Sequence, residues 1–316
     1  MSHRRIDLRV GTGPLDEGKS WNLAATVHLP DAPGENAPVL VALPGGGYTR
    51  HYFDLREPGY SEAEHHVGRG VVMVAIDHLR VGDSDIPELL DAGLEACAAA
   101  NHAAVGAILA KLRHGALDPG VEPIRPVAVI GSGQSMGGHI GLLMQANHRS
   151  FDGLAMLGSS VVCTKLPARV PGEEICLLGK QDASEGLAAL AAFDFRFAFH
   201  WEDVPDCFAQ VDVDAKRGAA PMPYWGSATT PDAGSGLVPG HFAGAAAMVS
   251  VPTLIAMGER DVCQDSLREL AAYMSTRDLA VFVVPKMAHM HNFAGTRALM
   301  WRRLSAFIAQ VADLQC

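Results

Sequence analysis

The sequence predicts an α/β protein, in which a mostly parallel twisted sheet is covered by helices on both faces. Three observations predict this class. Short, continuous apolar runs follow one another along the chain, longer segments with helical patterning separate them, and 48% of the 316 residues are hydrophobic. Continuous apolar runs are typical of strands buried on both faces, and their alternation with helices favours a parallel sheet.

The expected elements follow in chain order. Helices are expected over residues 88–112, 137–147 and 296–314, and the last of them carries an apolar stripe from Leu299 to Val311 that should pack on the sheet. The expected strands are the apolar runs at residues 25–29, 39–43, 71–76, 127–131, 153–157, 253–257 and 280–284.

The alternation of strands and helices stops between residues 163 and 250. This segment is rich in Pro, Gly and aromatic residues, as in the run from Pro221 to Gly226. A structureless loop of this length inside a compact domain is implausible. We therefore expect residues 1–162 and 251–316 to form the core and residues 163–250 to form an inserted cap.

Composition limits the classes of partner and the compartment. The formal net charge is −10 and basic residues are scattered, which disfavours nucleic acid as a partner. No apolar run approaches the length of a membrane span, and the N-terminus lacks the apolar core of a signal peptide. Six widely spaced cysteines are typical of reduced thiols, so a cytoplasmic location is expected. Nothing in the sequence defines the oligomeric state, and a homodimer is one possibility.

Ser135 lies at the centre of the most informative motif, Gly133-Gln134-Ser135-Met136-Gly137. Glycines two residues before and two after a serine suit a sharp strand-to-helix turn that exposes the hydroxyl. An apolar strand is expected upstream and a helix downstream, as this turn requires. Ser135 is therefore the candidate nucleophile.

A serine nucleophile needs an imidazole as base and a carboxylate that orients the imidazole. Asp261 follows the strand at residues 253–257, where active sites of open α/β sheets collect, and is the expected acid. Its neighbours Glu259 and Asp265 are alternatives, and a helix-capping role is the structural explanation for Asp261. His289 follows the last strand and is the expected base, with His291 as the alternative. The pair of histidines is too few for a zinc site, so no metal is expected.

Acyl transfer also needs N–H donors that stabilise the oxyanion. Met136 follows the nucleophile at a helix start and supplies one donor. The turn Pro44-Gly45-Gly46-Gly47-Tyr48 comes directly after the strand at residues 39–43 and is expected to supply the second, from Gly46 or, failing that, Gly47. A flexible turn without function is the simpler explanation for the glycines. A phosphate-binding loop is disfavoured because the Lys-Ser/Thr ending is missing.

Together these motifs resemble the α/β-hydrolase superfamily of the serine esterase type, over roughly residues 5–162 and 251–314. The order Ser135, Asp261, His289 is similar to that of the family. Residues 43–47 occupy the place of its H-G-G-G turn, with Pro44 in place of the histidine. Residues 77–84 resemble its D-x-R-G-x-G-x-S strand exit, with Arg80 in place of a glycine. The resemblance implies a cycle in which serine attacks an acyl carbon and water releases the acyl-enzyme, without a cofactor.

Aromatic residues from Phe193 to Trp201 alternate with other residues, which predicts a strand with five aromatic side chains on one face. The residues between them are Asp194, Arg196, Ala198 and His200. They either dock the cap on the core or line an acyl pocket, in which case bulky apolar esters are the expected small-molecule substrates. The candidate pocket residues are Tyr48, Phe197, Phe199, Trp201, Tyr224 and Trp225.

Carboxylic esters, lactones and thioesters are the expected substrates. C–C bond hydrolysis, amide hydrolysis and acyl transfer remain alternatives because they use the same triad. From other classes, a catalytically inactive binding protein with this fold is an alternative. Nucleotide binding is disfavoured because Gly131 to Met136 lacks the last glycine of G-x-G-x-x-G.

Overall fold

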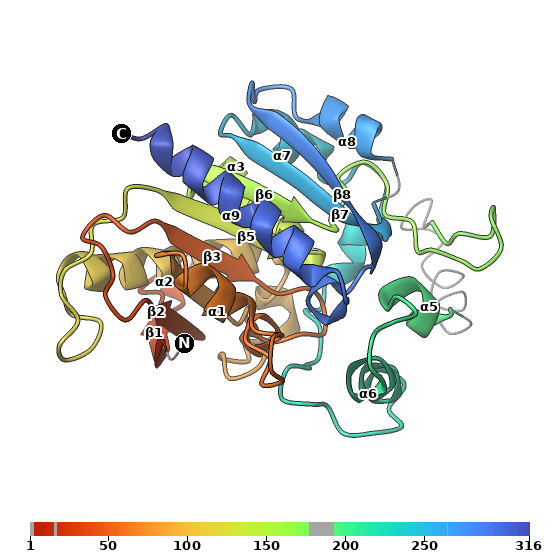
Figure 1. Cartoon of the computed structure of the whole chain (residues 1–316), viewed down its shortest axis with the longest axis horizontal. Coiled ribbons are helices and arrows are strands. Elements are labelled where there is room, and N and C mark those ends of the chain that lie inside the picture. The colour runs from red at the N-terminus through yellow and green to blue at the C-terminus, as the bar shows by residue number, and fades with distance from the viewer. Residues whose placement is uncertain (1–2, 16–17, 177–192, 264) are drawn as a thin grey trace.

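The computed structural model describes residues 3–15, 18–176, 193–263 and 265–316, and its centre is one eight-stranded sheet (Figure 1). The strand order is β1-β2-β4-β3-β5-β6-β7-β8. β1, β2 and β4 pair antiparallel, whereas the pairs from β4-β3 to β7-β8 are parallel. The strands are β1 (Arg4–Gly11), β2 (Asn22–Leu29), β3 (Val39–Leu43), β4 (Val72–Ile76), β5 (Val129–Gln134), β6 (Gly153–Leu157), β7 (Thr253–Arg260) and β8 (Leu279–Ala288).

Helices cover both faces of the sheet and enclose two apolar cores. Successive residues of β3 show the division, because Val39 and Val41 belong to one core and Leu40 and Ala42 to the other. α2 and α3 contribute to the first core, and α1 and α9 contribute to the second, on the face turned to the viewer in Figure 1. The helices of the core are α1 (Glu62–Val67), α2 (Leu94–Arg113), α3 (Met136–His148), α8 (Ser266–Ala272) and α9 (Arg297–Asp313).

The segment between β6 and β7 contains α5 (Phe195–Phe199), α6 (Asp206–Lys216) and α7 (Ala243–Met248). α5 and α6 lie to one side of the sheet in Figure 1. The segment returns to the loop after β3, where Thr49 N–H donates to the Trp225 carbonyl at 2.9 Å and Ser227 N–H donates to the Gly47 carbonyl at 2.9 Å. It therefore contacts the Gly-rich turn singled out in the sequence.

The expected α/β class is confirmed, and all seven expected strands are present. The strand expected over the aromatic residues 193–201 is wrong, because Phe195–Phe199 forms α5, whose N-cap Asp194 accepts a hydrogen bond from Phe197 N–H at 3.0 Å. His66, in α1, is fully buried. β1 was not expected, since its charged residues interrupt every apolar run.

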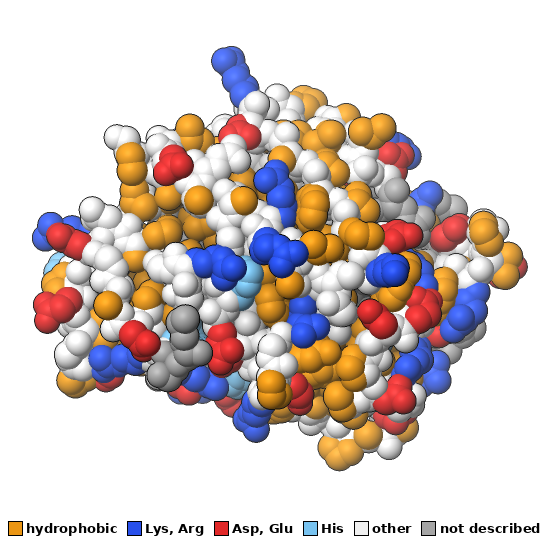
Figure 2. Space-filling view, viewed as in Figure 1, with side chains coloured by type: hydrophobic (Ala, Val, Ile, Leu, Met, Phe, Trp, Pro, Cys, Tyr) orange, Lys and Arg blue, Asp and Glu red, His pale blue; other side chains and the backbone are white. Residues whose placement is uncertain are grey.

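The surface of the molecule is mixed in character. On the face shown in Figure 2, basic side chains gather over α9 and α1 among acidic and apolar ones. Among the described helices, none combines the length and the apolar character that crossing a lipid bilayer requires.

Candidate active site

Ser135 occupies a sharp turn between β5 and α3, as the sequence predicts. Its φ of 53° and ψ of −121° lie outside the regions that residues with a side chain normally adopt. Its N–H donates to the Leu157 carbonyl at 2.8 Å, and its carbonyl accepts from Gly138 N–H at 2.8 Å. The turn is thereby held at both ends, and the half-buried Ser135 lines a cavity at the carboxyl end of the sheet.

The two glycines of the motif allow this turn because backbone passes very close to both. A Cβ at Gly133 would overlap the Gly137 carbonyl, and a Cβ at Gly137 would overlap the Leu43 carbonyl of β3. Both obstacles are backbone atoms of packed elements, which cannot move aside as a flexible side chain does. The spacing of the motif therefore has a steric cause.

We expect Gly137→Ala to lower the free energy of unfolding by about 2–4 kcal/mol, because the new methyl group displaces β3 from α3. Urea denaturation measures the change. The matched control is Gly106→Ala on the exposed face of α2, where nothing lies within 4 Å of a new Cβ. The control should be neutral or slightly stabilising. Equal stability of the two variants would contradict the steric explanation.

Asp261 follows β7, is fully buried and binds two histidines at once. Its Oδ1 accepts from His289 Nδ1 at 2.7 Å, and its Oδ2 accepts from His291 Nε2 at 2.7 Å. Backbone N–H groups of Gly258 and Val262 complete its shell at 2.8 and 2.7 Å. Burial alone would raise the pKa of Asp261, but the two paired imidazoles hold it well below its usual range. The carboxylate is therefore ionised throughout the neutral range.

The two histidines present different nitrogens to their surroundings. Since a carboxylate only accepts, His289 carries its proton on Nδ1 and leaves Nε2 as an acceptor. His289 Nε2 lies 3.4 Å from the side-chain amide of Gln134, whose Nε2 also donates to the His289 carbonyl at 3.0 Å. His291 instead uses Nε2, and its Nδ1 is buried with no hydrogen-bond partner among the described residues. His289 is thus the imidazole that faces the residue next to Ser135.

Ser135 and His289 are not hydrogen-bonded to each other in the described part of the chain. His289 Nε2 faces the Gln134 amide instead, at a distance slightly beyond that of a good hydrogen bond. Serine–histidine contacts in enzymes without substrate are often long and tighten when substrate binds. The site therefore contains an oriented imidazole whose acceptor nitrogen lies beside the turn that carries the serine and is only weakly bonded to Gln134.

The Gly-rich turn after β3 approaches Ser135 closely. A Cβ at Gly45 would lie 3.2 Å from Ser135 Cβ, and one at Gly46 would lie 3.6 Å from the Met136 sulfur. Gly46 is the one partly exposed glycine of the three. Gly47 has a φ of 87°, and its carbonyl accepts from Lys216 Nζ and from Ser227 N–H, so it anchors the turn to the segment after β6.

His78 supports the start of this Gly-rich turn through a hydrogen bond to Pro44. The Pro44 carbonyl accepts from His78 Nε2 at 2.9 Å, and His78 Nδ1 accepts from the Asn101 amide at 2.7 Å. Burial lowers the pKa of His78 to about 4, although both hydrogen bonds oppose the shift. Burial also lowers the pKa of His139, which lies in α3, to about 4. Both imidazoles are neutral in the folded protein at pH 7.

We expect the free energy of unfolding to fall as the pH is lowered from about 6.5 towards 4. The unfolded chain protonates these histidines near their ordinary pKa of 6.5, whereas the folded protein does so only near 4. The folded pKa is depressed, so the stabilisation is complete above about 6.5 and is lost on acidification. Each of the two buried histidines accounts for about 2–3 kcal/mol between pH 7 and 4.5. Urea unfolding at both pH values tests this, and an unchanged free energy would contradict it.

A cavity of about 50 Å³ adjoins Ser135. Its wall comes from four parts of the chain: the Ser135 turn with α3, the end of β6, the loop after Asp261, and the segment between β6 and β7. The lining residues are Ser135, Met136, His139, Gly158, Thr164, Ala233, Gly236, Leu237 and Val262.

None of the six aromatic residues expected in the pocket lines this cavity. Phe199 comes nearest to the site, since its ring meets that of His289 edge-on at 4.7 Å. Phe197 and Trp201 pack against the Arg260 guanidinium. Tyr48 is buried and donates to Asp212 Oδ2 at 2.6 Å, Trp225 packs on Phe293, and the Tyr224 hydroxyl accepts from Arg56 N–H. The other five thus have packing or anchoring contacts with residues other than Ser135, Asp261 and His289.

Sequence reasoning missed Gln134, His139 and Thr164. Gln134 is the unspecified residue of the serine motif, so only its contact with His289 reveals it. His139 stacks on Phe242 at 4.4 Å, and no motif includes either residue. The alternatives to Asp261 lie elsewhere: Glu259 accepts from Lys286 N–H at 2.9 Å, and Asp265 caps α8.

Comparisons with known proteins agree with this architecture. An esterase from Exiguobacterium antarcticum matches with a TM-score of 0.66 and 15% identity, over 96% of this chain and 100% of the esterase. A proline iminopeptidase from Mycobacterium smegmatis matches with a TM-score of 0.65 and 17% identity, over 98% and 100%. A thermophilic esterase from Thermogutta terrifontis matches with a TM-score of 0.61 and 16% identity, over 97% and 99%. No family model and no curated protein matches the sequence significantly.

These likenesses show that the chain has the α/β-hydrolase fold, which confirms the fold expected from the sequence resemblance. They extend over nearly the whole chain. At this level of identity the fold is what they establish.

Proposed function

We propose that the protein is a serine hydrolase of carboxylic esters that acts through Ser135, His289 and Asp261. One observation carries the proposal. His289 is held by an ionised, buried Asp261 with its acceptor nitrogen beside the strained turn that exposes Ser135. A serine hydroxyl needs such a base to become nucleophilic at neutral pH.

In the proposed reaction the Ser135 oxygen attacks the acyl carbon while its proton passes to His289 Nε2. The tetrahedral intermediate collapses when His289 gives that proton to the departing alcohol. Water then attacks the acyl-enzyme, again with His289 as base, and Ser135 recovers its proton when the acid leaves. Asp261 stays ionised throughout and stabilises the imidazolium that forms twice in the cycle.

The oxyanion formed in both steps needs N–H donors, which we assign to Met136 and Gly46. Met136 begins α3, so its N–H has no partner within the helix. Gly46 is the most exposed glycine of the facing turn and lies against the Met136 side chain. Gly47 instead anchors that turn, which makes it the weaker choice.

His289 rather than His291 is the proposed base. Both bind Asp261, but His291 does so through Nε2, and its remaining nitrogen is buried. The Gln134 amide beside His289 Nε2 is only weakly bonded at 3.4 Å. We propose that substrate binding replaces this contact with the hydrogen bond from Ser135.

Residues 163–250 act as the cap in this proposal, because Thr164, Ala233, Gly236 and Leu237 close the cavity beside Ser135. The described cavity beside Ser135 is small, and we propose that it takes a short acyl group. It gives no support to the bulky acyl group expected from the aromatic residues, most of which pack elsewhere.

A panel of p-nitrophenyl esters, with lactones and thioesters of matched size, tests the function. We expect the acetate and butyrate esters to be hydrolysed and the rate to fall steeply by octanoate, because the described cavity beside Ser135 is small. A maximum at octanoate would contradict the assigned acyl site. No hydrolysis of any compound above that of a Ser135→Ala variant would contradict the function itself.

That second outcome would favour a binding protein with a hydrolase fold. The absence of a hydrogen bond between Ser135 and His289 is the one observation that favours a binding protein. Ester hydrolysis remains the better explanation, because a binding protein has no need of a buried Asp261 that orients an imidazole.

A further inference from the structure

Three metal-binding side chains meet at the opposite end of the sheet from β7 and β8. His3 directly precedes β1, His28 lies near the end of β2, and Asp54 follows the short helix at Arg50–Phe53. His3 Nε2 lies 2.8 Å from His28 Nδ1, which lies 4.0 Å from Asp54 Oδ2. All three donor atoms fall within 4.8 Å of one another. His28 is 1% exposed and the Asp54 side chain 16%.

The distances between these donor atoms lie on either side of the distance between two ligand atoms on one metal ion. Donors at 2.0–2.2 Å from a tetrahedral zinc are separated by about 3.3 Å from each other. Imidazole nitrogen and carboxylate oxygen together suit zinc, copper, iron and nickel, whereas magnesium and calcium prefer oxygen alone. Three protein ligands leave at least one position of the ion open.

Neighbouring groups hold two of the three side chains, Asp54 and His28, in place. Ser61 Oγ donates to Asp54 Oδ1 at 2.7 Å and leaves Oδ2 facing His28. His28 is fixed within β2, which is paired on both sides. Arg5 Nη1 lies 3.6 Å from Asp54 Oδ2 and balances its charge, and the same guanidinium lies 3.4 Å from Asp7. Arg5 therefore keeps Asp7 as a carboxylate partner when Asp54 coordinates an ion.

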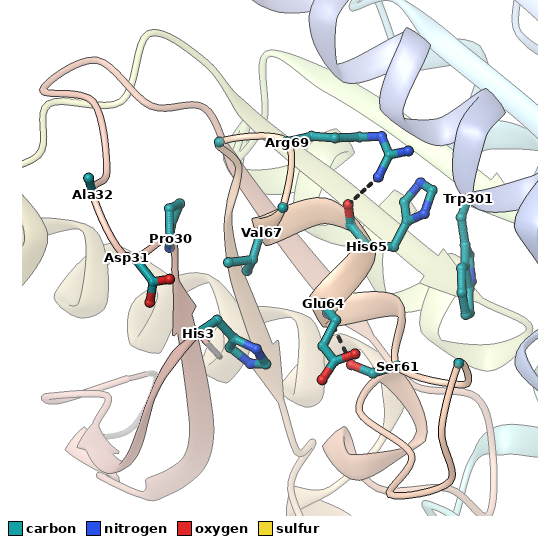
Figure 3. A pocket seen from close by; sticks show the side chains of 13 residues that line it. His3, Pro30, Asp31, Ala32, Ser61, Glu64, His65, Val67, Arg69 and Trp301 are labelled. Carbon is teal, nitrogen blue, oxygen red and sulfur yellow. Dashed lines mark hydrogen bonds between the residues drawn. The ribbon is translucent and has the colours of Figure 1, made fainter. Parts of the chain in front are cut away.

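A cavity of about 600 Å³ borders this cluster at His3. His3 and Ser61 line it together with Glu64, His65 and Trp301, and the His3 ring is turned towards Glu64 in the view of Figure 3. None of its lining residues belongs to the cavity beside Ser135. An ion at the cluster would therefore lie next to this cavity on its His3 side.

We propose that His3, His28 and Asp54 bind a divalent transition-metal ion of the zinc type, with water from the large cavity completing its coordination. The site is separate from Ser135 and does not depend on the proposed hydrolase function.

Titration of the chelator-treated full-length protein with Co²⁺ tests the site, because a Co²⁺ ion bound by imidazole and carboxylate gives visible absorption bands. We expect one Co²⁺ per chain, displaced by one Zn²⁺. Asp54→Asn and His3→Ala should weaken Zn²⁺ binding at least about 100-fold, since each removes a ligand. His3→Ala changes a partly exposed residue before β1, so it stays informative even if a variant of buried His28 fails to fold.

The matched control is His65→Ala, which changes a histidine on the wall of the same cavity outside the cluster. It should bind Zn²⁺ as the unchanged protein does. The proposal is overturned if the unchanged protein gives no Co²⁺ bands at stoichiometric metal, or if binding persists undiminished in both His3→Ala and Asp54→Asn.

Discussion

Replacing Ser135 by alanine is expected to lower kcat/KM for the preferred ester at least about 10⁴-fold, with the fold intact. The hydroxyl is the proposed nucleophile, and no other described residue lining the cavity offers an oxygen held in the same way at the carboxyl end of β5. The methyl group of alanine occupies the space of the serine Cβ, so the turn is preserved. Steady-state kinetics measures the loss, and urea denaturation confirms that the variant is folded.

The matched control for this variant is Ser132→Ala. Ser132 lies on the same strand, and its buried hydroxyl has no hydrogen-bond partner among the described residues. Removing it should change kcat/KM by less than about threefold, since no bond is lost. A Ser135→Ala variant that keeps more than a tenth of the activity would exclude Ser135 as the nucleophile.

Replacing the two histidines that bind Asp261 one at a time is expected to show which of them is the catalytic base. His289→Gln should lower kcat at least about 10⁴-fold, because it removes the imidazole that Asp261 orients beside the turn carrying Ser135. His291→Gln keeps a donor near Asp261 Oδ2 and should lower kcat about 3- to 30-fold through looser orientation of the carboxylate.

The pH dependence of kcat/KM is a second measurement, which would not change if His291 had a purely structural role. His291 helps to hold the pKa of Asp261 below its usual range, so its loss should shift that pKa upwards. The acid side of the kcat/KM profile should then change in His291→Gln while the alkaline side stays in place. If His291→Gln is the inactive variant and His289→Gln the active one, the assignment of the base is reversed.

The sheet was predictable because its central strands are continuous apolar runs. Residues 39–43 and 153–157 were predicted at the bounds of β3 and β6. β1 could not be predicted in this way, since one of its faces is exposed and its sequence is largely charged. The aromatic repeat at residues 193–201 shows the reverse error. A period of two in sequence suggested a strand, but Asp194 caps a helical turn in which Phe195 and Phe199 stack at 4.2 Å.

The candidate site was predictable where chain order and local motifs define it. The G-x-S-x-G motif placed Ser135, and strand ends placed Asp261 and His289, which the structure brings into hydrogen-bond contact. Two contacts could not be predicted in this way. His291 shares Asp261 with His289, and the Gln134 amide meets His289 from more than 100 residues away in the sequence. Such contacts, like the small size of the cavity, follow from three-dimensional packing and leave no local pattern in one sequence.

The most direct test of the central claim is covalent labelling by a fluorophosphonate, followed by peptide mass spectrometry. Such a reagent reacts with a serine only when a nearby base activates its hydroxyl. We predict one adduct per chain, on Ser135, which is absent in Ser135→Ala and strongly slowed in His289→Gln. A folded, unchanged protein that takes up no label, or that is labelled at another serine, would contradict the account.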